Sequence, residues 1–185
     1  LYATPEELNR AYNTAYPSFA AVQPLSPDQA DGSPSSVVRL RDYFNFYVQV
    51  TSDYAEFLCQ LIRAHGIDTP LMHNSANPGM NAYFTELKAK LGDDLLLGSD
   101  HYYNLSQSWP QNNPTPQYAR NVFLSMESLR LMHQPPTILE LPSGSASDWP
   151  PITAVDAAAC YMTNLAYGMK GHNYYVFTGG PNPPG

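Results

Sequence analysis

Apolar residues recur at three- and four-residue steps in five stretches of the chain, the spacing of helices that pack on one face. The first predicted helix begins at Thr4-Pro5-Glu6-Glu7, where a hydroxyl cap is followed by proline at the first helical position and by an acidic residue at the third. It ends at Pro17. Residues 17–36, rich in Pro, Ser, Asp and Gln, are predicted to form a long surface loop. The other predicted helices span about 42–66, 78–91, 116–133 and 153–169.

Between these helices lie short apolar runs that end in polar or turn-forming residues, which predicts strands. The predicted strands are 67–74, 95–100, a strand that begins at Thr137 and stops at Pro142, and 172–178. Helix and strand therefore alternate along the chain, which is typical of a parallel α/β sheet with right-handed crossovers.

Two parallel α/β architectures fit this alternation. A doubly wound sheet usually has a Gly-rich phosphate loop after its first strand, and none of these strand ends has one. A (β/α)₈ TIM barrel places its chemistry at the carboxyl ends of the strands, and every predicted strand here ends in polar residues. We therefore expect residues 1–185 to form one partial catalytic domain, an α/β half-barrel of about four βα units that would be strands 5–8.

A half-barrel implies a missing half. Open sheet edges favour association, so we expect the remaining strands in the same polypeptide, most of them before Leu1, or in a companion chain. Association into a homo-oligomer is a further expectation. Because the sequence starts at Leu1 rather than at Met, we expect a fragment or a processed product.

The polar strand ends are His73 and Asn74, then residues 99–103, then Glu140, then Thr178. Glu140 is the most informative of them, because a carboxylate at the end of an apolar strand must lose hydration unless hydrogen-bond partners hold its charge. Its position predicts either a functional carboxylate or a side chain whose head reaches the solvated rim.

Composition narrows the substrate class. A formal net charge of -7 with nine Lys and Arg leaves no basic stripe for nucleic acid, and it favours a neutral or small polar substrate. No apolar run approaches membrane-spanning length and no basic, apolar-cored signal precedes the first helix, so no membrane partner is expected, while secreted and cytoplasmic locations both stay open. Cys59 and Cys160 lie in separate helical stretches and are expected to be buried free thiols.

Four motifs, in chain order, resemble retaining β-galactosidases. Residues 8–12, Leu-Asn-Arg-Ala-Tyr, are similar to the helix that follows the acid/base strand in glycoside hydrolase family 42. Residues 98–103, Gly-Ser-Asp-His-Tyr-Tyr, are similar to its sixth strand, and residues 139–144, Leu-Glu-Leu-Pro-Ser-Gly with Trp149 following, resemble its seventh-strand nucleophile segment. Residues 174–182, Tyr-Tyr-Val-Phe-Thr-Gly-Gly-Pro-Asn, look like the eighth strand of family 35.

This resemblance implies a retaining hydrolase of terminal β-galactosides with Glu140 as the nucleophile and no cofactor. Such enzymes need a second carboxyl group roughly 5 Å away as acid/base. In these families it is a Glu after an Asn on the fourth strand, and no Asn-Glu pair occurs in this chain. We expect it in sequence before Leu1. The alternative is a non-catalytic carbohydrate-binding relative, or an inactive fragment, that lacks the acid/base.

Other polar and aromatic residues of these motifs and strand ends are expected to contact the sugar. The expected substrate-binding residues are His73, Asn74, Asp100, Tyr102, Tyr103, Trp149 and Thr178. Tyr102 or Tyr103 is expected to donate a hydrogen bond to Glu140, with an aromatic rim residue as the alternative. Trp149 offers a ring face to the sugar, or else packs on the barrel. The alternative for His73 is a loop cap.

Two competing constellations are weaker. Residues 99–101, Ser-Asp-His, are consecutive, and neighbouring strand residues point to opposite faces, which argues against a nucleophilic triad. His73, Asp100 and His133 have no paired-His or Cys spacing that would support a metal site, so none is predicted.

Overall fold

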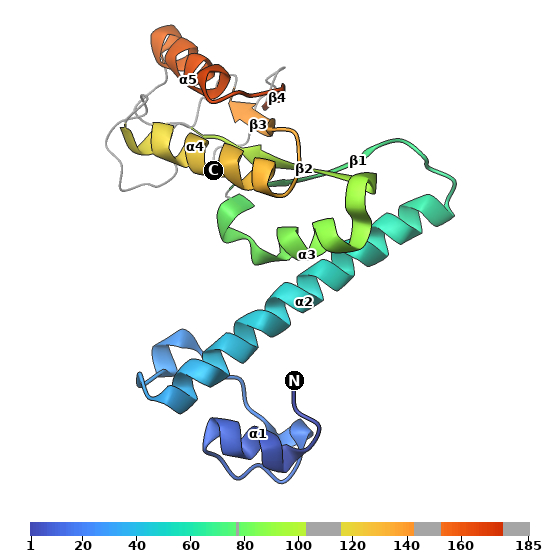
Figure 1. Cartoon of the computed structure of the whole chain (residues 1–185), viewed down its shortest axis with the longest axis vertical. Helices are drawn as coiled ribbons and strands as arrows, with labels where there is room; N and C mark the ends of the chain where they lie inside the picture. The colour runs from blue at the N-terminus through green and yellow to red at the C-terminus, as the bar shows by residue number, and fades with distance from the viewer. Residues whose placement is uncertain (77, 103–115, 143–152, 176–185) are drawn as a thin grey trace, which may run out of the picture. The chain divides into compact units, whose positions relative to one another are not determined.

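The computed structural model describes residues 1–76, 78–102, 116–142 and 153–175. The chain divides into two compact units, Leu1–Ala55 and Glu56–Gly185. The described residues form one sheet of four parallel strands with five α-helices (Figure 1), which confirms the predicted α/β class and is consistent with a partial TIM-barrel-like fold.

The first unit is built on α1 (Pro5–Tyr12) and the first part of α2 (Pro34–Ala64). Thr4 caps α1 as predicted, because its hydroxyl accepts the backbone N–H of Glu7. The helix ends earlier than predicted, at Asn13, which adopts the left-handed conformation with φ of 52°. Short 3₁₀ turns at Phe19–Ala21 and Pro27–Gln29 interrupt the segment that was predicted to be a loop.

The prediction that α2 starts near Asp42 is wrong, because the helix begins at Pro34. Ser33 provides the start: its hydroxyl accepts the backbone N–H of Ser36, and its carbonyl accepts that of Val37. The predicted loop therefore ends before residue 36.

The large aromatic side chains that predicted α2 are mostly exposed. Those more than half exposed are Phe44, Phe46, Tyr47, Tyr54 and Phe57. Within the described residues no helix is both long enough and apolar enough to cross a membrane.

In the second unit the strands follow chain order across the sheet. They are β1 (Leu71–Ser75), β2 (Leu95–Asp100), β3 (Thr137–Pro142) and β4 (Gly171–Tyr175). β1 begins later than predicted, because the Arg63 guanidinium, near the end of α2, donates to the carbonyls of Ile67 and Thr69 and fixes that segment as a turn. Since all strands are parallel, their carboxyl ends lie at one edge of the sheet.

The remaining helices are α3 (Ala82–Leu91), α4 (Pro116–Leu131) and α5 (Ala154–Ala166). A buried core joins α4, β3 and α5, and its members are Tyr118, Val122, Met126, Ile138, Leu141 and Cys160. Both cysteines are free thiols as predicted, but Cys59 is only partly buried. This core holds β3, and with it Glu140, against the helices.

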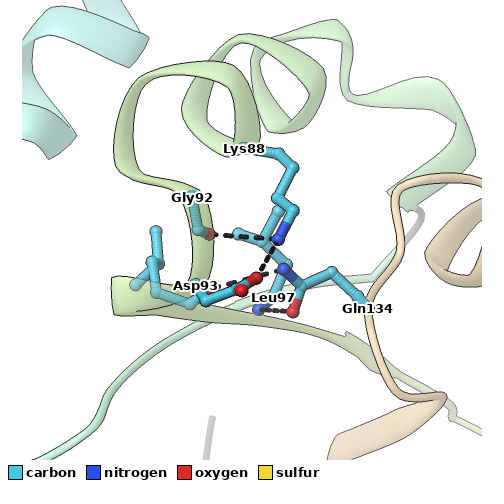
Figure 2. A network of polar contacts seen from close by, with 6 residues as sticks. Lys88, Gly92, Asp93, Leu97 and Gln134 are labelled. Atoms are coloured by element: carbon cyan, nitrogen blue, oxygen red, sulfur yellow. Dashed lines mark hydrogen bonds and ion pairs between the residues drawn. The ribbon is translucent and has the colours of Figure 1, made fainter.

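Gln134 stabilises the start of β2 before that strand pairs with β3. The two strands pair only from Ser99 onward, so the backbone of β2 before that point needs other partners on this side. The buried Gln134 amide supplies them: its oxygen accepts the N–H of Leu97 at 3.2 Å, and its nitrogen donates to the carbonyl of Leu95 at 3.4 Å (Figure 2). Lys88, at the end of α3, closes the turn before β2 by donating to Gly92 O and Asp93.

Candidate active site

Three neighbouring strands bring a polar cluster together at the carboxyl edge of the sheet. We define the carboxylate cluster as Asn74 of β1, Asp100 of β2, Glu140 of β3 and Tyr102, the second residue after β2. These residues are among those that the sequence singled out. Tyr103, Trp149 and Thr178 lie outside the described residues.

A register shift aligns the two carboxylates. Ser99 pairs with Ile138, but the next residue, Asp100, pairs with Glu140, so β3 contributes one residue more than β2 over this step. Such a bulge re-aims side chains and is common beside active sites. Without it Asp100 would face Leu139.

The Asn74 amide bridges the two acids. Its nitrogen lies 2.8 Å from Glu140 Oε1 and 3.0 and 3.1 Å from the two oxygens of Asp100. Because an amide nitrogen carries two hydrogens, one can serve each carboxylate. The nearest oxygens of the two acids are therefore at most about 6 Å apart.

The Tyr102 hydroxyl donates to the other oxygen of Glu140. Glu140 thus accepts a hydrogen bond on each oxygen, which fixes the orientation of the carboxylate. Burial, followed by this hydrogen bond and the nearby carboxylate charges, raises the pKa of Tyr102, so the phenol stays a neutral donor. Its ring also meets that of Tyr175, on β4, with centroids 6.4 Å apart.

Asp100 is the member of the cluster whose charge is least favourable. It is 7% exposed, and burial together with the charge of Glu140 raises its pKa to about 6, although the Asn74 hydrogen bond opposes this. Among the described residues no Lys or Arg forms an ion pair with either acid. In the described part of the chain, neutral donors therefore serve a buried Asp100 and a partly buried Glu140.

His73 is not part of the carboxylate cluster. Adjacent strand residues point to opposite faces, so its side chain leaves Asn74 and packs against α3, with its ring centroid 5.7 Å from that of Tyr83 and 5.3 Å from that of Phe84. Burial lowers the pKa of His73, which keeps the ring neutral in this aromatic setting. Its side chain therefore lies on the face of the sheet that packs against α3.

A second polar network, which the sequence did not predict, joins the residue after β2 to α5 and α4. The His101 backbone N–H donates to the carbonyl of Glu140 at 2.9 Å, and its buried ring places Nδ1 2.5 Å from the Asn164 amide oxygen. Asn164, on α5, donates to the Tyr118 hydroxyl on α4 at 2.9 Å. Burial lowers the pKa of His101 to about 4, so the ring is neutral and Nδ1–H is the donor.

This network also argues against a nucleophilic triad formed by the consecutive residues 99–101, Ser-Asp-His. The His101 ring contacts Asn164 and points away from the cluster, while Ser99 Oγ is buried and has no hydrogen-bond partner in the part of the chain that the structure describes. A polar Asn in the mainly apolar second half of α5 was the signal in the sequence that could have revealed the contact.

Known proteins similar to this chain agree with a carbohydrate-active site. Residues 1–179 match glycoside hydrolase family 42, described as beta-galactosidase. A protein of Ignavibacterium album named beta-1,2-glucosyltransferase is 29% identical over 200 residues, an alignment that covers 100% of this chain and 26% of that protein. The chain therefore spans about a quarter of the length of that relative. Because the match covers almost all of its residues, the chain belongs to glycoside hydrolase family 42.

Proposed function

We propose that this chain carries the nucleophile of a retaining β-galactosidase and that Glu140 is that residue. The observation that carries the proposal is the pair of hydrogen bonds from Asn74 and Tyr102 to the two oxygens of Glu140 at the carboxyl edge of the sheet. Such donors hold the carboxylate in one orientation, which nucleophilic attack requires.

In the proposed reaction a Glu140 oxygen attacks the anomeric carbon of a terminal β-galactoside. The glycosidic bond breaks, and the leaving oxygen takes a proton from an acid. Water then attacks the glycosyl ester, gives a proton back to that group and releases Glu140 as carboxylate. We assign the acid/base to sequence outside this chain, because no Glu follows an Asn here.

The same proposal assigns this chain strands 5–8 of the catalytic barrel, with similarity to both family 42 and family 35. It is supported by parallel strands that lie in chain order and by polar residues at the described strand ends. The other strands would come from the same polypeptide or a companion chain. Asn74 and Asp100 are proposed to contact sugar hydroxyls from the same edge, together with Tyr103, Trp149 and Thr178.

The similar glucosyltransferase favours a second candidate activity, transfer of the sugar to another sugar rather than to water. Both reactions can proceed through the same covalent ester, so they differ only in the acceptor. Product analysis with and without an added sugar acceptor separates them: a transferase forms a new glycoside faster than free sugar, whereas a hydrolase releases free sugar.

Trapping tests the nucleophile directly. The complete protein is incubated with a 2-fluoro galactosyl donor, digested, and the label mapped by mass spectrometry; we expect the label on Glu140. Glu140→Gln should abolish turnover while sugar binding persists, and Glu140→Gly should regain turnover with azide, giving the inverted product. A label on another carboxylate would refute the assignment.

A further inference from the structure

The first unit contains a cavity that the proposed chemistry does not use. It has a volume of about 200 Å³ and lies between the end of α1, residues 22–25 and α2. We call it the Arg39 pocket, after the guanidinium in its wall. Pockets for drug-sized ligands are usually about 300–1,000 Å³, so this one suits a single small ring.

The pocket has an unused hydrogen-bond donor. Arg39 Nη2 donates to the Tyr16 hydroxyl at 3.3 Å and to the Gln23 carbonyl at 3.2 Å, but the buried Nε–H has no acceptor among the described residues. Leaving such a group unpaired is unfavourable, so a small turn of the guanidinium that brings it onto a ligand oxygen in the cavity would be favoured.

The charges in the wall favour a neutral ligand. The wall carries one positive side chain, Arg39, and one negative side chain, Asp42, which is 5% exposed. Asp42 accepts hydrogen bonds from the Tyr2 hydroxyl at 2.6 Å and from Arg41 at 2.9 Å. These bonds outweigh burial, which acts in the opposite direction, and lower the pKa of Asp42, so the carboxylate is charged.

Aromatic rings form the rest of the wall. Tyr43 and Phe46 are three residues apart on α2 and therefore lie on one face of the helix, and the Tyr12 ring lies beneath the Arg39 guanidinium, 5.8 Å from its carbon. Phe46 is 61% exposed, so a ligand can reach it. An aromatic face beside hydrogen-bonding groups matches a sugar ring, which presents C–H groups on one side and hydroxyls at its edge.

We propose that the Arg39 pocket is a second carbohydrate site that binds one neutral sugar residue, with C–H groups against Phe46 and a hydroxyl oxygen on Arg39. The site is independent of catalysis at Glu140.

Equilibrium dialysis of the complete protein with labelled galactose tests the proposal. Arg39→Met keeps an unbranched apolar stem of similar reach and removes the donor, and we expect it to lose one equivalent of bound galactose per chain, or to weaken that equivalent about tenfold or more. Arg10→Met is the matched control, because Arg10 is exposed on α1 and does not line the cavity. It should leave binding unchanged.

A second variant keeps the test decisive if Arg39→Met does not fold. Phe46→Ala changes an exposed side chain and should lose the same equivalent. Unchanged stoichiometry and affinity in a folded Arg39→Met or Phe46→Ala protein would overturn the proposal. So would a pocket that binds inorganic phosphate or galacturonate but not galactose.

The activity assay separates this site from Glu140. Arg39→Met should hydrolyse a small nitrophenyl galactoside at the unaltered rate. Loss of all activity in Arg39→Met with galactose stoichiometry unchanged would also refute a separate binding site. If Glu140 proves not to be the nucleophile, the equivalent of galactose that depends on Arg39 should persist.

Discussion

Asp100→Asn should stabilise the protein at neutral pH, although it alters a residue of the candidate active site. The pKa of Asp100 is raised from its ordinary value of 3.8 to about 6. Since each pKa unit corresponds to about 1.36 kcal/mol, the folded protein loses up to about 3 kcal/mol by keeping this side chain charged. Asparagine removes this charge and with it the repulsion between the two carboxylates. Its amide can act as a hydrogen-bond donor, which a carboxylate cannot.

The effect of Asp100 on folding stability depends on pH in a direction that follows from its raised pKa. Below pH 3.8 Asp100 is protonated in the folded and unfolded chains, so it costs nothing. Between pH 3.8 and about 6 the unfolded chain ionises first, and above about 6 the full cost is present. We expect Asp100→Asn to raise the free energy of unfolding by about 1–3 kcal/mol at pH 7.5 and by less than about 1 kcal/mol at pH 4.

Urea unfolding of both proteins at the two pH values measures this difference, because all other titrating groups are shared and cancel. Asp93→Asn is the control: Asp93 is exposed and its hydrogen bond from Lys88 lowers its pKa, so its removal should give no gain at high pH. A lower stability of Asp100→Asn at pH 7.5, or an equal gain at both pH values, would refute the reasoning.

Three further substitutions test the supports of the site. Tyr102→Phe removes a donor to Glu140 and should slow covalent trapping about 10–100-fold, measured by mass spectrometry; an unchanged rate would show that the hydroxyl is dispensable. Asn164→Leu leaves the buried ring of His101 unpaired and should lower the free energy of unfolding by about 1–3 kcal/mol in urea, and equal stability would contradict the network. Gln134→Met keeps the side-chain length but unpairs two backbone groups of β2, so it should cost about 2 kcal/mol in the same assay; a loss below about 0.5 kcal/mol would mean that water replaces the amide.

The helices and strands could be predicted because a cap or an apolar repeat depends on only a few neighbouring residues. The Thr4-Pro5 cap and the apolar spacing of α3 to α5 placed most elements within a few positions. The start of α2 was missed although Ser33-Pro34 is the same kind of signal, a hydroxyl before a first-turn proline. The aromatic residues from Tyr43 onward predicted the helix, whereas the Ser33 cap fixes its actual start.

The candidate site was predictable as a set of strand ends but not as a set of contacts. Parallel strands in chain order bring Asn74, Asp100 and Glu140 to one edge, and that follows from the alternation of helix and strand. The bridge through the Asn74 amide does not follow, because it depends on the bulge that pairs Asp100 with Glu140. A one-residue shift between strands leaves no mark in a single sequence.

The donors around Glu140 are neutral groups, and this affects how the carboxylate can react. A Lys or Arg paired with the nucleophile would hold its charge more firmly than an amide and a phenol do, and that extra stabilisation would have to be given up when the carboxylate becomes a neutral ester. Neutral donors orient the nucleophile and cost less to lose, and the charge of Asp100 repels that of Glu140 until Glu140 becomes a neutral ester. If this is the basis of reactivity, Asp100→Asn should slow trapping at pH 7.5 while it stabilises the fold, whereas at pH 4, where Asp100 is protonated, the two proteins should trap at similar rates. A variant that is both more stable and faster at pH 7.5 would show that the second carboxylate has another role.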